Sequence, residues 1–115
     1  MEKQMNLKKY LEGKSGEAAR FLAETVKFES LKGSEAEVQT FIAKTFRRLG
    51  YDAKLVPVGE NIRKDRHYTF FDVDYPYKGR PNVVTRIKGS GGGKSLILNC
   101  HSDVVPAKNW KDAFK

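Results

Sequence analysis

The sequence contains little cysteine and no long hydrophobic run. A single cysteine, Cys100, excludes an intrachain disulfide in this 115-residue chain and is typical of a reducing compartment. The apolar runs are only a few residues long, whereas a membrane-spanning helix needs about 20 such residues, so we expect no membrane partner. Residues 1–5 lack the apolar core of a secretory signal, and the expected location is therefore cytoplasmic.

Acidic residues are scarce relative to basic ones, since 22 Lys and Arg stand against 14 Asp and Glu and give a net charge of +8. Such an excess occurs in proteins that bind nucleic acid or anionic surfaces. No basic run exceeds two residues, however, and acidic residues are interspersed with them, as on an ordinary solvated surface. We therefore expect no nucleic-acid partner, and keep as an alternative function a small stand-alone module that binds an anionic partner.

The composition that remains is that of a globular protein, with 39% hydrophobic and 31% charged residues. Its clearest element is a helix predicted over residues 34–49. Ser34 and Glu37 have the spacing of a capping box, and Gly50 is a typical helix stop. Apolar residues recur at helical spacing and predict one buried face, made of Val38, Phe41, Ile42, Phe46 and Leu49.

A second helix is predicted over residues 15–28, after a short helical lead-in that ends before Gly13. Its expected buried stripe consists of Ala18, Phe21, Leu22 and Val26. The link between the two helices is short, so we expect the helices to be neighbours in space.

Three strands are predicted after the helices, over residues 51–58, 82–88 and 95–100. Pro57 near the end of the first strand is typical of a sheet edge. The glycine-rich segment between the other two strands predicts a hairpin. Leu96, Ile97 and Leu98 follow one another without alternation, as expected for a strand covered on both faces. Helices that need a partner surface and a doubly covered strand indicate an α/β layered fold.

A long loop is predicted over residues 59–81, where the hydrophobic pattern has no steady period. Loops of this length inside a domain are uncommon and often functional. The aromatic residues of the loop are equally suited to anchor it to the core; they are Tyr68, Phe70, Phe71, Tyr75 and Tyr77.

The candidate functional residues are His101 and Asp103, which follow the last predicted strand. Strand ends in open α/β sheets are where ligand sites form. A neutral imidazole is a good zinc ligand, and a carboxylate two residues away can hydrogen-bond it and raise its basicity. The alternative interpretation is a half-buried structural histidine whose aspartate begins a turn that Pro106 closes.

Residues 95–106, Ser-Leu-Ile-Leu-Asn-Cys-His-Ser-Asp-Val-Val-Pro, resemble the N-terminal part of the M20 family of zinc-dependent peptidases and deacylases. Residues 80–89, the glycine-rich turn, Trp110 and the two leading helices fit the same resemblance. The family includes acetylornithine deacetylase, succinyl-diaminopimelate desuccinylase, aminoacylase and carboxypeptidase G-type enzymes. The aromatic loop favours the acetylornithine-deacetylase-like branch slightly.

The resemblance implies a zinc-peptidase-like α/β/α layered catalytic domain, with two leading helices followed by strands of a mixed sheet. It matches His101 to the first zinc ligand of the family and Asp103 to a catalytic carboxylate that supports the metal site. Two zinc ions bridged by a water are implied in the intact enzyme. The implied substrate is an N-acyl amino acid or a small peptide, cleaved at an amide bond.

The chain also departs from the family pattern. Cys100 stands where the family has glycine, and we expect a small buried side chain there. The other metal ligands and the glutamate general base have no match in residues 1–115, and His67 matches none of them. We therefore expect a partial catalytic domain, cut after its first metal-ligand motif. It is predicted to bind zinc weakly, to hydrolyse nothing alone, and to pair or aggregate through an exposed sheet edge.

Overall fold

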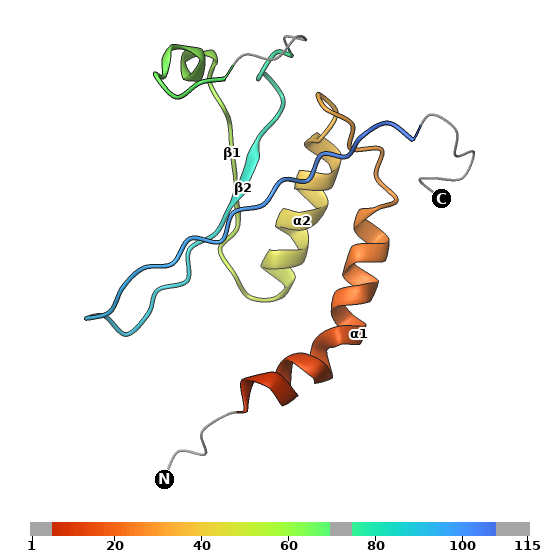
Figure 1. Cartoon of the computed structure of the whole chain (residues 1–115), viewed down its shortest axis with the longest axis vertical. Helices are drawn as coiled ribbons and strands as arrows, with labels where there is room; N and C mark the ends of the chain where they lie inside the picture. Colours follow the sequence, from red (N-terminus) through yellow and green to blue (C-terminus); the bar gives the residue numbers. More distant parts are fainter. Residues whose placement is uncertain (1–5, 70–74, 108–115) are drawn as a thin grey trace.

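Two antiparallel helices lie beside a small sheet in the computed structural model, which describes residues 6–69 and 75–107 (Figure 1). The elements follow one another as α1 (Leu7–Thr25), α2 (Ala36–Arg48), β1 (Lys54–Val56), the 3-10 helix η1 (Glu60–Lys64) and β2 (Asn82–Val84). The expected mixture of helices and strands is confirmed. Phe70, Phe71 and Trp110 lie outside the described residues.

Helix α1 is one continuous helix of 19 residues, so the predicted lead-in is helical but the predicted break at Gly13 and the predicted start at residue 15 are wrong. The Asn6 side chain accepts the Lys9 N–H at 3.1 Å and caps the helix there. Gly13 and Gly16 cost about 1 kcal/mol each relative to alanine without ending the helix. No helix in the described part of the chain is long and apolar enough to cross a membrane.

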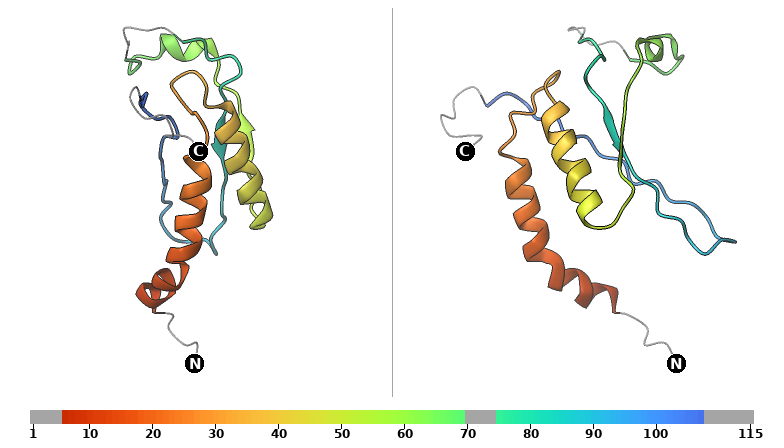
Figure 2. Two further views of the ribbon diagram at one scale, coloured as in Figure 1. Left: turned by 90° about the vertical axis from the view of Figure 1, so that its right-hand side faces the viewer. Right: turned by 180° about the vertical axis from the view of Figure 1, so that it is seen from behind.

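The predicted buried stripe of α1 is also wrong, because no residue of this helix is buried. Leu22 is 62% exposed and Val26 49%. The contact with α2 is made through aromatic rings: Phe21 stacks on Phe41 with centroids 5.9 Å apart, and Phe28 lies 5.2 Å from the same ring. Within the described residues, α1 therefore meets α2 only near its C-terminal end, and residues 7–24 are all exposed (Figure 2).

Helix α2 supplies the centre of the core and packs against both strands. Val38 and Ala43 are fully buried, together with Ala53 just before β1. The end of the helix is as predicted: Gly50 has a φ of +88°, its N–H bonds the Arg47 carbonyl, and the Tyr51 N–H bonds that of Phe46. This C-terminal motif turns the chain from α2 toward β1.

The N-terminal end of α2 differs from the prediction. The helix begins at Ala36, its N-cap is Glu35, and no side chain caps it. Ser34 lies in the preceding turn, where its N–H bonds the Leu31 carbonyl, so the predicted capping box with Glu37 does not form. The carboxylate of Glu35 is instead committed to partners outside the helix.

Strands β1 and β2 pair antiparallel, with Leu55 opposite Val83 at the centre of the register. Each has three residues, so the strands predicted over 51–58 and 82–88 are present but much shorter. Between them, part of the predicted long loop folds as η1.

Residues 85–100, which we call the arm, leave β2, turn at the glycines and return toward the N-terminal end of α2 (Figure 1). The predicted strand over residues 95–100 is absent, and so is the hairpin pairing. Leu96, Ile97 and Leu98 are 82–88% exposed, so the expected coverage on both faces is wrong for the described structure. The apolar pattern indicates a covered strand, but no described segment lies where it would supply that cover.

Candidate functional site

Residues 101–104, which we call the site turn, are fixed to the segment between α1 and α2. The Ser30 hydroxyl donates to the Ser102 carbonyl at 2.8 Å, and the Val104 N–H donates to the Ser30 carbonyl at 2.9 Å. An isolated parallel bridge pairs Leu31 with Val104. Ser30 is only 3% exposed, so these bonds form away from competing water.

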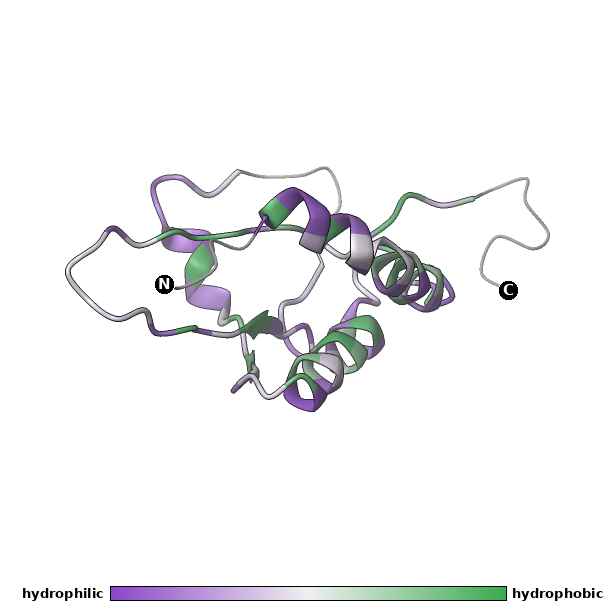
Figure 3. Cartoon of the chain, turned by 90° about the horizontal axis from the view of Figure 1, so that it is seen from below, coloured by the Kyte–Doolittle hydropathy of each residue, from purple (hydrophilic) through white to green (hydrophobic). Residues whose placement is uncertain are grey.

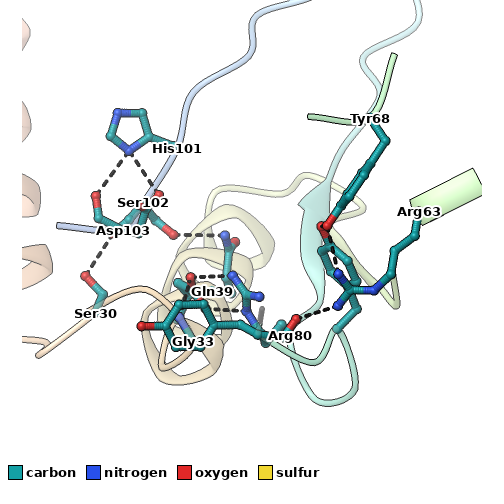
Figure 4. A network of polar contacts seen from close by, with 12 residues as sticks. Ser30, Gly33, Gln39, Arg63, Tyr68, Arg80, His101, Ser102 and Asp103 are labelled. Atoms are coloured by element: carbon teal, nitrogen blue, oxygen red, sulfur yellow. Dashed lines mark hydrogen bonds and ion pairs between the residues drawn. The ribbon is translucent and has the colours of Figure 1, made fainter. Parts of the chain in front are cut away.

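Helix α2 holds the same turn from a second direction. Gln39, in the first turn of the helix, donates from Nε2 to the Ser102 hydroxyl oxygen at 2.9 Å. Both the backbone and the side chain of Ser102, the residue between His101 and Asp103, are thus bonded to the helical layer (Figure 4). The positions of its two neighbours follow from this attachment.

His101 and Asp103 are brought together as their spacing predicted. The imidazole Nδ1 lies 3.1 Å from the Asp103 carbonyl oxygen and 3.2 Å from its Oδ1. Both partners are acceptors, so a neutral ring carries its proton on Nδ1 and leaves the lone pair on Nε2. The His101 side chain is 84% exposed and that of Asp103 44%, so the half-buried structural histidine of the alternative interpretation is not what the structure contains.

A part-buried ion pair lies beside the site turn. Arg80 donates from Nε and Nη2 to the two carboxylate oxygens of Glu35, each at 2.8 Å. Burial favours the neutral form of Glu35, but the hydrogen bonds from Arg80 and from the Gly33 N–H outweigh it and lower the pKa of the carboxyl below its ordinary value. The bond to Glu35, with a smaller contribution from the charge of Asp103, raises the pKa of Arg80.

A second arginine ties together the two ends of the loop before β2. Arg63 bonds Glu60 at 2.6 Å, the Tyr68 hydroxyl at 2.9 Å and the Tyr75 carbonyl at 2.8 Å. Its guanidinium also lies 4.8 Å from the ring centroid of Tyr77, which in turn lies 5.6 Å from the Arg80 guanidinium. In the described part of this loop, the aromatic residues therefore fix the loop to Arg63, and Tyr77 also packs against Arg80.

Cys100 is exposed, which corrects the expectation of a small buried side chain. It belongs to the arm, where no described segment covers it. His67 bonds its own neighbours instead of the site turn: its Nε2 lies 2.9 Å from Arg66 Nε, and its N–H donates to Asp65. No three His, Cys, Asp or Glu side chains among residues 6–69 and 75–107 lie close enough to hold one metal ion.

The sequence analysis did not predict the long-range bonds that hold the site turn, or the ion pair beside it. The bonds from Ser30 and Gln39 join residues 72 and 63 positions apart, and the Glu35–Arg80 pair joins residues 45 apart. Of these residues, only Arg80 carried a signal, through its place at the start of the segment that resembles the M20 family.

Comparison with family models, with curated proteins and with solved structures finds no match to this chain.

Proposed function

We propose that this chain is the N-terminal part of the catalytic domain of a zinc-dependent amidohydrolase of the M20 type, with an α/β/α layered fold. Its substrate would be an N-acyl amino acid or a small peptide. In this proposal His101 binds one of two zinc ions through Nε2, and Asp103 holds the imidazole in position. We propose a cytoplasmic location, because a free, exposed cysteine is typical of proteins in a reducing compartment.

The observation that carries the proposal is the contact of His101 Nδ1 with two oxygens of Asp103. A zinc-binding histidine needs a lone pair on the nitrogen that meets the metal and a partner on the other nitrogen. Asp103 is such a partner, and the exposed Nε2 is such a ligand atom. The attachment of Ser102 to Ser30 and Gln39 supports the same conclusion, because a ligand that is already held in place loses less conformational freedom when it binds metal.

One imidazole does not make a catalytic zinc site, which needs about three protein ligands and a water. We propose that polypeptide other than the described residues supplies the remaining ligands and the general base. Bound zinc would polarise the amide carbonyl and lower the pKa of the attacking water. In this proposal the role of the chain is to hold His101 in one tautomer, and we expect the chain alone to hydrolyse no substrate.

The test is a zinc titration followed at the histidine nitrogens by NMR, in a Cys100→Ser background that removes the exposed thiol. Without zinc, His101 should be in the Nδ1–H tautomer. Added zinc should shift Nε2 of His101, with an affinity weaker than micromolar. Asp103→Ala should weaken this binding by about tenfold, since a partner of the ligand is lost.

His67→Ala is the matched control, because it removes the other histidine and should leave the titration unchanged. The proposal fails if zinc shifts His67 while His101 stays unchanged, or if zinc binds His101 through Nδ1. Binding tighter than micromolar would contradict the expectation that this chain lacks the other ligands.

A further inference from the structure

The arm exposes aliphatic side chains on both of its faces. Ile87 is 70% exposed, and Leu96, Ile97 and Leu98 are 82%, 86% and 88% exposed. Successive side chains of an extended segment point in opposite directions, so Ile97 faces away from its two neighbours. Figure 3 shows hydrophobic stretches on the extended arm as well as on the helices. Contiguous exposed apolar groups of this kind mark interaction sites.

The backbone of the arm is unpaired as well. No backbone-to-backbone hydrogen bond joins residues 85–103 to any other residue in the described ranges. The first such bond after β2 is made by the Val104 N–H. The arm therefore offers both free amide groups and apolar side chains, which are the two requirements for adding a strand from another polypeptide.

The charge of this part of the chain is one-sided. Between residues 75 and 102 the sequence contains no Asp or Glu, although acidic residues are interspersed with basic ones elsewhere. The same stretch contains Lys78, Arg80, Arg86, Lys88 and Lys94. Arg80 is committed to Glu35, but Arg86, Lys88 and Lys94 are exposed on the arm. An occupant with acidic groups would be attracted to it, and an occupant with basic groups repelled.

We propose that residues 95–100 of the arm bind an extended, acidic segment of another polypeptide by strand addition. A strand added to the arm places its own side chains beside those of the arm on both faces of the pair. Such cover fits the exposure of Leu96, Ile97 and Leu98, which point to both faces. An anionic lipid surface covers one face only. A second copy of the chain would bring two basic arms together. The charge and the exposure both favour an acidic strand.

This proposal does not depend on zinc binding by His101, and its test is kept separate from that of the proposed function. The probe is a short synthetic peptide of alternating Val and Thr, flanked on each side by Glu. It is titrated into the full chain, and binding is followed by fluorescence anisotropy and by the backbone amide resonances of the protein. We expect the resonances of residues 95–100 to shift, and those of α1 to stay in place.

Three peptide controls test the chemistry of the occupant. The same peptide flanked by Lys should bind at least about tenfold more weakly. A peptide with a central proline should bind about as weakly, because proline removes an N–H that the strand needs. Vesicles of phosphatidylserine and phosphatidylcholine should not bind the chain. Equal binding of the Glu-flanked and Lys-flanked peptides, or binding to the vesicles in place of the peptide, would overturn the proposal.

Protein variants locate the surface. Ile97→Pro should lower the affinity by about tenfold, and Ile97→Thr, which keeps the N–H and the branched side chain, should lower it by about threefold or less. Since Ile97 is exposed and its N–H bonds no described residue, neither change removes a contact of the described fold. Equal affinities for the two variants would contradict strand addition.

Charge reversal separates a local effect from a general one. Arg86→Glu/Lys88→Glu/Lys94→Glu, in the arm, is compared with Lys9→Glu/Arg20→Glu/Lys44→Glu, which changes the net charge equally at exposed sites on the helices. Only the arm variant should lose affinity, by about tenfold. His101→Ala should bind the peptide normally. Self-association of the chain without peptide, seen by sedimentation velocity, would assign the arm to a second copy and refute the proposal.

Discussion

The site turn and the adjoining half of the arm are consecutive in sequence, but the site turn is hydrogen-bonded to the rest of the described structure and this half of the arm is not. Ser102 accepts hydrogen bonds from Ser30 and Gln39, and the Val104 N–H donates to the Ser30 carbonyl. The Glu35–Arg80 ion pair lies beside this turn. Residues 95–100 make no backbone hydrogen bond within the described part, and their aliphatic side chains face solvent. The site turn is thus positioned by the helical layer and does not depend on a completed sheet.

The largest expected difference between the bonded region and the arm is in stability, and two matched arginine substitutions measure it. Arg80→Ala should lower the free energy of unfolding by about 2–3 kcal/mol, because it leaves the carboxylate of Glu35 part-buried without its main partner. Arg86→Ala, in the arm, should change it by about 0.5 kcal/mol or less. Urea unfolding followed by far-UV circular dichroism measures both.

A double variant shows whether the ion pair is the cause. Glu35→Ala/Arg80→Ala should recover part of the loss, because the unpaired carboxylate is then gone as well. If Arg80→Ala and Arg86→Ala are equally mild, the ion pair adds no more to the stability of the fold than an exposed arginine of the arm does.

Amide hydrogen exchange measures the same contrast residue by residue. The Val104 N–H, bonded to the Ser30 carbonyl, should exchange on the order of tenfold or more slowly than the amides of Leu96, Ile97 and Leu98, after correction for intrinsic rates. Comparable protection of the two regions would mean either that the arm is paired in solution or that the Val104 N–H is not bonded there, and either result would remove the contrast.

The smallest effect is expected from a matched pair of serines. Ser30→Ala should cost about 1 kcal/mol, since it removes the buried hydroxyl that bonds the Ser102 carbonyl, and it should mix the two tautomers of His101. Ser95→Ala, at an exposed position of the arm, should change neither quantity. The measurements are urea unfolding and the nitrogen resonances of His101. A tautomer that stays fixed in Ser30→Ala would show that Asp103 alone orients the ring.

Local signals predicted the elements that depend on neighbouring residues. Gly50 marked the end of α2 correctly because its positive φ and the two backbone bonds of the turn are properties of that short stretch. The contact between His101 and Asp103 follows in the same way from a separation of two residues. The start of α2 was missed because Ser34, the predicted cap, lies in the turn before the helix, and the N-cap is Glu35, whose side chain bonds Arg80 far along the chain.

The error in the arm has a different origin. A run such as Leu96, Ile97 and Leu98 indicates a strand that other polypeptide covers, and it carries no information about whether that polypeptide is present. The pattern of α1 was misleading for the same reason, since the apolar residues Leu22 and Val26 are 62% and 49% exposed. Sequence periodicity identifies surfaces that can be buried, while burial itself depends on what is packed against them.

The bond between Ser30 and Ser102 has a kinetic consequence. It joins residues 72 positions apart, whereas the helices form from contacts of a few residues and β1 and β2 close a shorter loop. The entropy lost on closing a loop grows with its length, so contacts between distant residues slow folding. We expect the site turn to reach its final position late, after α2 and the sheet have formed, so that folding of the described chain ends at His101 and Asp103.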